Sequence, residues 1–148
     1  MTIAALFLAA ACHLNVDARG VILPDRACTP GDTLNVAAVD ICIKGYTKTV
    51  RKVSRATHEG IFEVYGIMAH RAGEYEVDHL ISLELGGSNS AFNLWPQPAS
   101  PRPGFRQKDL CENRAHALVC EGNLTLEQAQ VGISVDWLTF CRSIGAVK

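Results

Sequence analysis

The sequence predicts a small α+β protein, because two short strand-like segments precede two segments with helical periodicity. Residues 75–80 are rich in β-branched and aromatic side chains with partial alternation, and residues 92–95 form a second short run that ends at a proline. Residues 105–120 and 125–145 instead repeat apolar side chains at helical spacing. Together these segments predict a β-β-α unit followed by one further helix.

Length and composition favour a single globular domain. The chain has 148 residues, which suits one modest core, and it is 48% hydrophobic and 20% charged. Its formal net charge is -1, so the overall charge does not indicate a nucleic-acid partner. A local basic segment would have to provide that interaction.

The cysteines predict disulfides and an oxidising compartment. There are six of them and no C-x-x-C pair. Cys111 and Cys120 lie on one predicted helix, too far apart to bond each other. Pairing Cys42 with Cys120 would tie the basic segment, residues 44–55, to this helix. Pairing Cys111 with Cys141 would join the last two helices. The sequence alone does not prove these pairs.

The N-terminus predicts export to the periplasm or the exterior. Residues 1–11 are almost entirely apolar and end in small residues, which is typical of a signal peptide, although no Lys or Arg precedes them. The segment is shorter than the roughly 20 residues that span a bilayer. Cleavage before Cys12 is expected. Lipid attachment at Cys12 and a buried N-terminal helix are the alternatives; Ala9 disfavours the lipoprotein because a leucine is expected there.

A basic stretch marks the N-terminal segment, residues 12–57. Five basic side chains and no acidic one fall between positions 44 and 55: Lys44, Lys48, Arg51, Lys52 and Arg55. Basic side chains interleaved with Tyr and Thr suit phosphate binding. A solvated charged face explains the same composition, and the sequence does not decide between the two. Residues 61–68 are apolar enough for a helix or a strand.

The helix over residues 105–120 carries a polar face. Leu110, Cys111, Ala115, Leu118 and Val119 share one face, and Asp109, Glu112, Asn113 and His116 lie roughly opposite. Glu112 and His116 point the same way, since they lie four residues apart. Thr125 and Gln128 form a capping box that predicts the start of the last helix.

Polar side chains interrupt the apolar segment that precedes these helices. Asp78 and His79 end the first predicted strand, Gly86 and Gly87 mark a turn, and Asn93 opens the second strand. Neighbouring side chains on a regular strand face opposite sides. Asp78 and His79 therefore serve one site only if the strand breaks at this point.

This segment resembles the signature of the HNH (ββα-metal, His-Me finger) endonuclease superfamily, and particularly its small exported bacterial members. The matching residues are Asp78-His79, Gly86-Gly87-Ser88-Asn89 and Asn93-Leu94-Trp95-Pro96. Residues 42–51, 108–113, 119–122 and 129–130 add weaker similarity, so the resemblance covers most of the chain beyond residue 22. It implies a ββα-metal core with an additional C-terminal helix, and an HNH-type nuclease domain over residues 58–148.

The resemblance implies a divalent-metal-dependent endonuclease of low sequence specificity. Asp78 would coordinate the metal, and His79 would be the general base, suited by its ordinary pKa of about 6.5. Asn93 would bond across the hairpin and hold the His79 loop in place. The phosphate-binding candidates are Lys44, Lys48, Arg51, Lys52, Arg106 and Lys108, with DNA favoured over RNA and no obligate protein partner.

One departure from the family pattern concerns the last metal ligand. The usual His or Asn after the second strand is missing, because residues 98–103 offer no suitable side chain. The helix must then supply the ligand: Glu112 first, His116 second, with Asn113 and Asp109 behind them. Oxygen ligands would suit Mg²⁺ or Mn²⁺, and His116 would allow Zn²⁺ or Ni²⁺.

The missing ligand also supports a rival hypothesis. An exported, non-catalytic domain that binds nucleic acid or metal would keep the same scaffold and need no complete metal site. The intact Asp78, His79 and Asn93 favour the enzyme instead.

Overall fold

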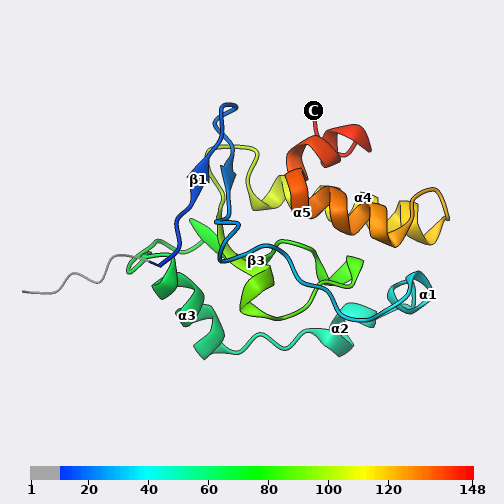
Figure 1. Ribbon diagram of the computed structural model, residues 1–148, viewed down its shortest axis with the longest axis horizontal. Coiled ribbons are helices and arrows are strands. Elements are labelled where there is room, and N and C mark those ends of the chain that lie inside the picture. The colour runs from blue at the N-terminus through cyan, green and yellow to red at the C-terminus, as the bar shows by residue number, and fades with distance from the viewer. Residues whose placement is uncertain (1–10) are drawn as a thin grey trace, which may run out of the picture.

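The computed structural model describes residues 11–148 and contains two pairs of short strands and five helices, which loops connect (Figure 1). The elements are β1 (Asn15–Val16), β2 (Ile22–Leu23), α1 (Ala38–Ile41), α2 (Tyr46–Val50), α3 (Arg55–Val64), β3 (Tyr75–His79), β4 (Leu94–Pro98), α4 (Phe105–Cys120) and α5 (Leu126–Ser143). β1 pairs with β2 and β3 with β4, both antiparallel. This mixed architecture confirms the predicted α+β class.

The predicted signal peptide, except Ala11, lies outside the described residues. Within residues 11–148, none of the helices has the length and apolarity needed to cross a bilayer.

The β3–β4 pair lies at the centre of the molecule. It pairs Tyr75 with Pro98 at one end and His79 with Leu94 at the other. Figure 1 shows α4 and α5 on one side of β3, and α2 and α3 on the other. Asp78 and His79 at the end of β3 therefore lie between the basic segment and α4.

The predicted bounds of the second strand are wrong. The strand was expected over residues 92–95, but Phe92 lies in a 3₁₀ turn (Ala91–Asn93) and β4 continues through Pro96 and Pro98. Proline lacks the N–H that a central strand needs. A two-stranded ribbon leaves one edge of each strand unpaired, so both prolines are tolerated there.

Helix α4 has the predicted bounds, and Cys111, Ala115 and Val119 of its predicted apolar face are buried, but its buried surface also includes charged side chains. Leu110 was assigned to the apolar face, yet it is 59% exposed, whereas Lys108 and Glu112 are buried. The buried side chains on the other flank are Cys111, Ala115 and Val119, which belong to the core shared with α5. The helix therefore packs along two flanks, and one of them contains charged side chains that neutralise each other.

Helix α5 begins as predicted. The Thr125 hydroxyl accepts a hydrogen bond from the Gln128 amide, and the Gln128 side chain accepts one from Thr125 N. Both belong to the predicted capping box. The helix is kinked at Asp136, whose φ of -155° and ψ of 89° are not helical.

The N-terminal part contains short elements that no sequence pattern predicted. The β1–β2 hairpin and α1 lie within residues 15–41. Helix α3 begins at Arg55, inside the basic stretch, because the Ser54 hydroxyl caps it by accepting from Thr57 N. α3 also crosses positions 57 and 58, where the sequence suggested a boundary between the N-terminal segment and the nuclease domain.

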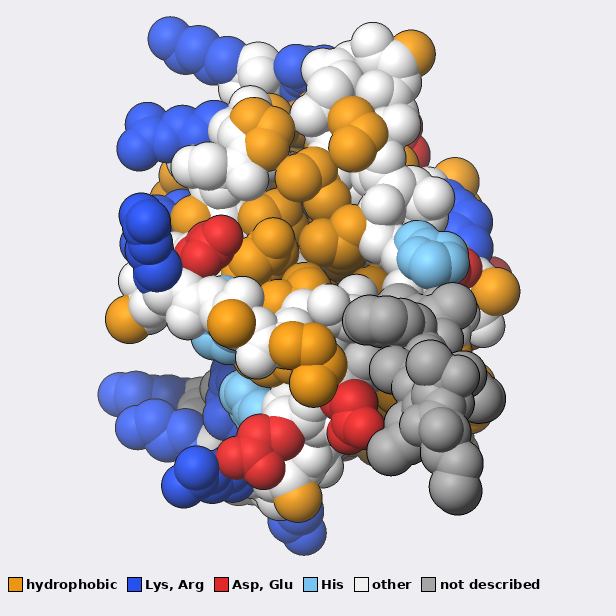
Figure 2. Space-filling view, turned by 90° about the vertical axis from the view of Figure 1, so that its left-hand side faces the viewer, with side chains coloured by type: hydrophobic (Ala, Val, Ile, Leu, Met, Phe, Trp, Pro, Cys, Tyr) orange, Lys and Arg blue, Asp and Glu red, His pale blue; other side chains and the backbone are white. Residues whose placement is uncertain are grey.

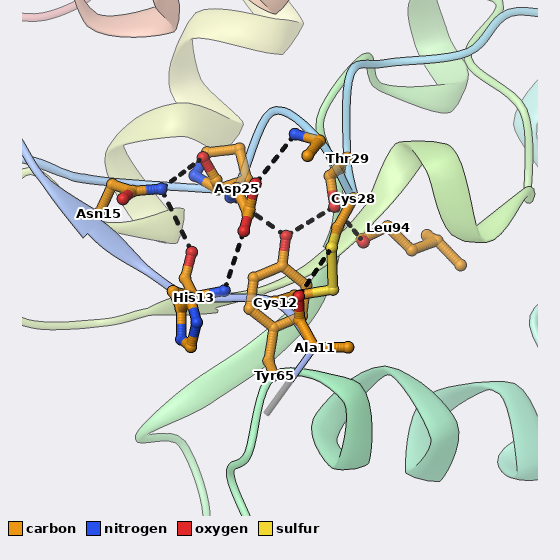
Figure 3. The surroundings of a disulfide bond; sticks show 11 residues. Ala11, Cys12, His13, Asn15, Asp25, Cys28, Thr29, Tyr65 and Leu94 are labelled. Atoms are coloured by element: carbon orange, nitrogen blue, oxygen red, sulfur yellow. Dashed lines mark hydrogen bonds between the residues drawn. A yellow bond between two sulfur atoms is a disulfide. The ribbon is translucent and has the colours of Figure 1, made fainter. Parts of the chain in front are cut away.

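Three disulfides cross-link the chain. The predicted pairs Cys42–Cys120 and Cys111–Cys141 are both present. Cys12–Cys28 joins the first described residues to the loop after β2, beside Tyr65, whose hydroxyl bonds to Thr29 (Figure 3). Three such bonds in a small domain are typical of an oxidising, extracytoplasmic environment.

Candidate active site

Asp78 and His79 both line one pocket of about 280 Å³ at the end of β3. Both residues lie within β3, where Asp78 pairs with Trp95 and His79 with Leu94, so the strand break expected between them is not present. Instead, Asp78 Oδ1 accepts a hydrogen bond from His79 N at 2.8 Å, which holds the carboxylate at the His79 end of the strand. The polar residues that line this acidic pocket are Arg51, Glu76, Asp78, His79, Ser82, Glu84, Asp109, Glu112 and Asn113. The acidic pocket thus combines residues from the basic segment, β3, the loop after it and α4.

Lys108 lies fully buried beneath this pocket. Its ammonium donates to Asp78 Oδ2 at 2.9 Å, to the His79 carbonyl at 2.6 Å and to Glu112 Oε1. Burial alone would lower the pKa of Lys108, but the carboxylates of Asp78 and Glu112 raise it above its ordinary value. Lys108 therefore stays charged. The prediction that it contacts phosphate is wrong, because its side chain has no exposed surface.

Glu112 comes from α4 and lies beside Asp78, since both carboxylates bond to the same ammonium. It is 8% exposed and lines the acidic pocket. Burial raises the pKa of Glu112; the Lys108 charge opposes this, and the Asp78 carboxylate adds to it. Helix α4 thus places Glu112, the first choice for the ligand from the helix, next to Asp78, the predicted metal ligand on β3.

His116 is not part of this pocket. Its Nε2 lies 3.0 Å from the Ile41 carbonyl and 3.6 Å from Cys120 Sγ, and it lines a neighbouring hollow instead. Four residues along a helix advance the chain by about 6 Å. This rise places the imidazole beside α1, so the prediction that His116 joins Asp78 as a metal ligand is wrong.

His79 is held by Asn89, which is part of the sequence motif but had no predicted role. Its Nε2 lies 3.2 Å from Asn89 Oδ1. The Asn89 amide is oriented by the main chain of the basic segment: Nδ2 donates to Val50 O at 2.7 Å, and Oδ1 accepts from Lys52 N at 3.3 Å. Because Oδ1 is an acceptor, Nε2 carries the proton and Nδ1 keeps its lone pair.

The protonation of His79 suits a base. Burial lowers its pKa, while the Asn89 bond and the Asp78 charge oppose that shift only in part. The imidazole is therefore neutral at pH 7, with Nδ1 able to accept a proton. The sequence feature that could have indicated this arrangement is the carboxamide of Asn89, which directly follows Gly86-Gly87-Ser88.

Asn93 is fully buried and braces the loop that follows His79. Its Oδ1 accepts from Ile81 N at 2.9 Å, and its Nδ2 donates to the carbonyls of Ile81 and Ser88, both at 2.9 Å. These hydrogen bonds hold the loop after His79, as the sequence predicted for Asn93, and all three are made to main-chain atoms. Gly87 belongs to this brace, because a Cβ there would lie 1.8 Å from Ile81 O.

The acidic pocket has more negative than positive groups. Burial raises the pKa of Glu76, Glu84 and Asp109, and for each of them a neighbouring carboxylate adds to the shift. With Asp78 and Glu112 they make five carboxylates, against the two cations Lys108 and Arg51. The Ser82 hydroxyl also lines the pocket, buried and without a hydrogen-bond partner in the described part of the chain.

This donor set fits a hard divalent cation. Carboxylate and hydroxyl oxygens are the ligands that Mg²⁺ and Mn²⁺ prefer. A cation would relieve the repulsion between carboxylates that adds to the effect of burial on these pKa values. With His116 elsewhere, the donors that favour Zn²⁺ or Ni²⁺ are fewer than the sequence suggested.

Positive side chains flank the acidic pocket. Lys44, Lys48, Arg51 and Lys52 are exposed around α2, and exposed Arg106 lies at the start of α4 with its guanidinium over the Phe105 ring. None of the five forms an ion pair among residues 11–148. Figure 2 presents a different face, the left-hand side of Figure 1 away from α2, on which Lys and Arg side chains lie mostly along one side.

Comparison with family models, with curated proteins and with solved structures found no match to this chain. The interpretation of the site therefore depends on its geometry and on the sequence motif.

Proposed function

We propose that this chain is a divalent-metal-dependent endonuclease, with a ββα-metal core, that hydrolyses phosphodiester bonds in nucleic acid with little sequence specificity. One observation carries the proposal: Asp78, Glu112 and a neutral His79, from two distant segments, line a single acidic pocket. The flanking basic side chains add a means of holding a polyanion beside it.

Asp78 and Glu112 would hold the ion, with the unpartnered Ser82 hydroxyl as a further oxygen donor. When bound, Mg²⁺ or Mn²⁺ neutralises charge on the scissile phosphate and on the leaving oxygen. Lys108 fixes the two carboxylates relative to each other and balances one of their charges. It acts as a positioning residue, since no substrate reaches it.

His79 would remove a proton from the attacking water through Nδ1. Asn89 keeps the proton on Nε2 and holds the ring, while Asn93 and Gly87 hold the loop that follows it. The lowered pKa leaves the ring unprotonated at neutral pH, as a general base requires.

Substrate contacts would come from the exposed basic residues. Lys44, Lys48, Lys52 and Arg106 would bind phosphates along the strand without distinguishing bases. Arg51 differs from them because it lines the acidic pocket itself. It is therefore the candidate for contact with the scissile phosphate.

The test is cleavage of plasmid DNA and of a structured RNA by the purified chain, with Mg²⁺, Mn²⁺, Zn²⁺ or Ni²⁺ supplied separately. His79→Ala should lower the cleavage rate by about 10²–10⁴-fold, the range of general-base catalysis. His58→Ala, which changes a histidine on α3 away from the pocket, is the matched control. Equal rates in the His79 variant and the wild type would exclude this mechanism.

A second candidate function is a non-catalytic domain that binds nucleic acid on the same scaffold. The position of Lys108 favours it, because its ammonium lies between Asp78 and Glu112, where a shared cation would bind both carboxylates. Binding of DNA or RNA without cleavage under any of the four metals would support this candidate and reject the enzyme.

A further inference from the structure

An exposed disulfide lies next to a histidine at the far end of α4. Cys42 follows α1, Cys120 is the last residue of α4, and His116 precedes Cys120 by one turn. His116 Nε2 is 3.6 Å from Cys120 Sγ, and the two sulfurs and one imidazole nitrogen lie within 4.8 Å of one another. Two segments far apart in the sequence thus bring three soft donor atoms together.

This disulfide is the most accessible of the three. Cys42 and Cys120 are exposed, whereas Cys111 and Cys141 are 0% exposed and Cys12 is 4% exposed. Thiol–disulfide exchange requires a thiolate to reach one of the sulfurs. An external reductant should therefore open Cys42–Cys120 first and leave the core between α4 and α5 cross-linked.

We propose that reduction of this disulfide creates a zinc site made by Cys42, His116 and Cys120, separate from the acidic pocket. A dithiol reductant supplies two electrons and two protons, forms its own cyclic disulfide, and leaves two cysteine thiols. Zn²⁺ then forms two Zn–S bonds and one Zn–N bond, and the two thiol protons pass to solvent.

The donor set selects zinc. Two thiolates and one imidazole are a Cys₂His set, which binds Zn²⁺ with a fourth position left for water or another ligand. His116 and Cys120 are four residues apart on α4, so both face the same side of the helix. The nearby hollow of about 250 Å³ is also lined by Glu84, whose carboxylate is a candidate for the fourth position.

His116 must change its hydrogen bond to bind the metal. Nε2 now donates to the Ile41 carbonyl at 3.0 Å, so in this state the proton is on Nε2. Zinc binding through Nε2, the nitrogen beside Cys120 Sγ, requires the other tautomer, with the proton on Nδ1, and the ring remains neutral. The metal would restore the link between α1 and α4 that reduction breaks.

The first experiment identifies the reduced bond. The native chain is treated with increasing dithiol, alkylated and analysed by peptide mass spectrometry. Cys42 and Cys120 should be labelled before the other four cysteines, and Zn²⁺ added before alkylation should protect both. Simultaneous labelling of all six cysteines, or labelling that zinc does not change, would overturn the proposal.

The second experiment uses Co²⁺ as a spectroscopic probe on the selectively reduced chain. A thiolate-to-cobalt charge-transfer band should appear, should be displaced by Zn²⁺, and should be absent from the oxidised chain. His116→Ala retains both sulfurs and should weaken Co²⁺ binding by roughly tenfold or more, whereas His58→Ala should not change it.

Asp78→Asn distinguishes the two metal sites, because oxygen ligands give no thiolate band and this variant should keep the band at full intensity. The proposal fails if reduced wild type gives no band, or if His116→Ala binds Co²⁺ as tightly as the wild type.

Discussion

Lys108 is the residue on which the candidate site depends most for its stability. A buried ammonium between two carboxylates costs desolvation energy, and it is tolerated because all three charges are paired. Removing the cation leaves the buried carboxyl groups of Asp78 and Glu112 facing each other without a counter-charge. The energetic effect of this one side chain therefore exceeds that of any exposed lysine on the surface.

Lys108→Met should lower the free energy of unfolding by about 3–5 kcal/mol, the cost of leaving buried charges unpaired. Urea denaturation at pH 7 measures it, with the exposed Lys48→Met as the matched control. Mg²⁺ should recover part of the loss, since it would replace the missing positive charge. A loss below 1 kcal/mol, of the size typical for an exposed ion pair, would contradict the buried position of the Lys108 ammonium between the two carboxylates.

Asn89 provides a second prediction at this scale. Its bond raises the pKa of His79 against the effect of burial, and it also holds the ring. Asn89→Ala should therefore reduce kcat by about 10–100-fold and move the acidic limb of the pH–rate profile to lower pH, because the imidazole loses its proton more easily.

The measurement is the pH dependence of cleavage, with Asn123→Ala, in an exposed turn after α4, as the control. A fall in kcat with an unmoved acidic limb would mean that Asn89 supports the loop alone and does not act on His79.

At the scale of elements, the helices that were predicted correctly are those that local sequence patterns encode. Helix α4 and the start of α5 followed from apolar periodicity, proline and glycine punctuation, and the box formed by Thr125 and Gln128. The elements β1, β2, α1 and α2 span two to five residues each, too few to produce a periodic signal. β4 was shortened because proline usually ends a strand.

The buried charged flank of α4 could not be predicted, because long-range pairing determines it. An amphipathic pattern places Leu110 inside and Lys108 outside. The actual orientation depends on Asp78, thirty residues earlier in the chain, whose carboxylate receives the Lys108 ammonium. For the same reason, the missing ligand and the polar face of the helix made Glu112 a candidate, but they gave no reason to expect that Lys108 lies between it and Asp78.

The β1–β2 hairpin is fastened to α5 by an ion pair with a predictable pH dependence. Arg19, in the hairpin turn, bonds to Asp17 and to Asp136 at the kink of α5. The Arg19 guanidinium lowers the pKa of Asp17. Burial would raise the pKa of Asp136, but hydrogen bonds from Arg19 and Thr139 hold it below its ordinary value.

The pKa of these carboxyl groups is lower in the folded state than in the unfolded state, where it is about 3.9. The ion pair therefore stabilises the fold at pH values above about 3.9, and this stabilisation is lost as the pH falls through the folded-state pKa. Arg19→Met should therefore be less stable than the wild type at pH 6, and the difference should shrink toward pH 3. Urea unfolding across this range tests it. A difference independent of pH would show that Arg19 acts by packing and not by its charge.

At the scale of the whole molecule, the distribution of charge matters more than its sum. A net charge of -1 gives no general attraction to a polyanion. The exposed basic residues around α2 nevertheless lie beside the acidic pocket, because Asn89 bonds to Val50 and Lys52 and so holds that segment against the His79 loop. Phosphate binding is thus expected on one face only.

This arrangement predicts how nucleic-acid affinity responds to salt. The slope of log affinity against log salt concentration is negative, and each phosphate contact that is lost should reduce its magnitude by about one. Lys48→Ala with Lys52→Ala, in a His79→Ala background that prevents cleavage, should therefore reduce the slope by about two and weaken binding equally for unrelated sequences.

Lys148→Ala is the matched control, since the C-terminus lies on the side of the molecule opposite α2 in Figure 1. Fluorescence anisotropy with a labelled duplex, repeated over a salt series, gives both slopes. An equal loss of slope in the control would mean that binding is spread over the whole surface. The position of the basic segment beside the acidic pocket would then have no role in substrate binding.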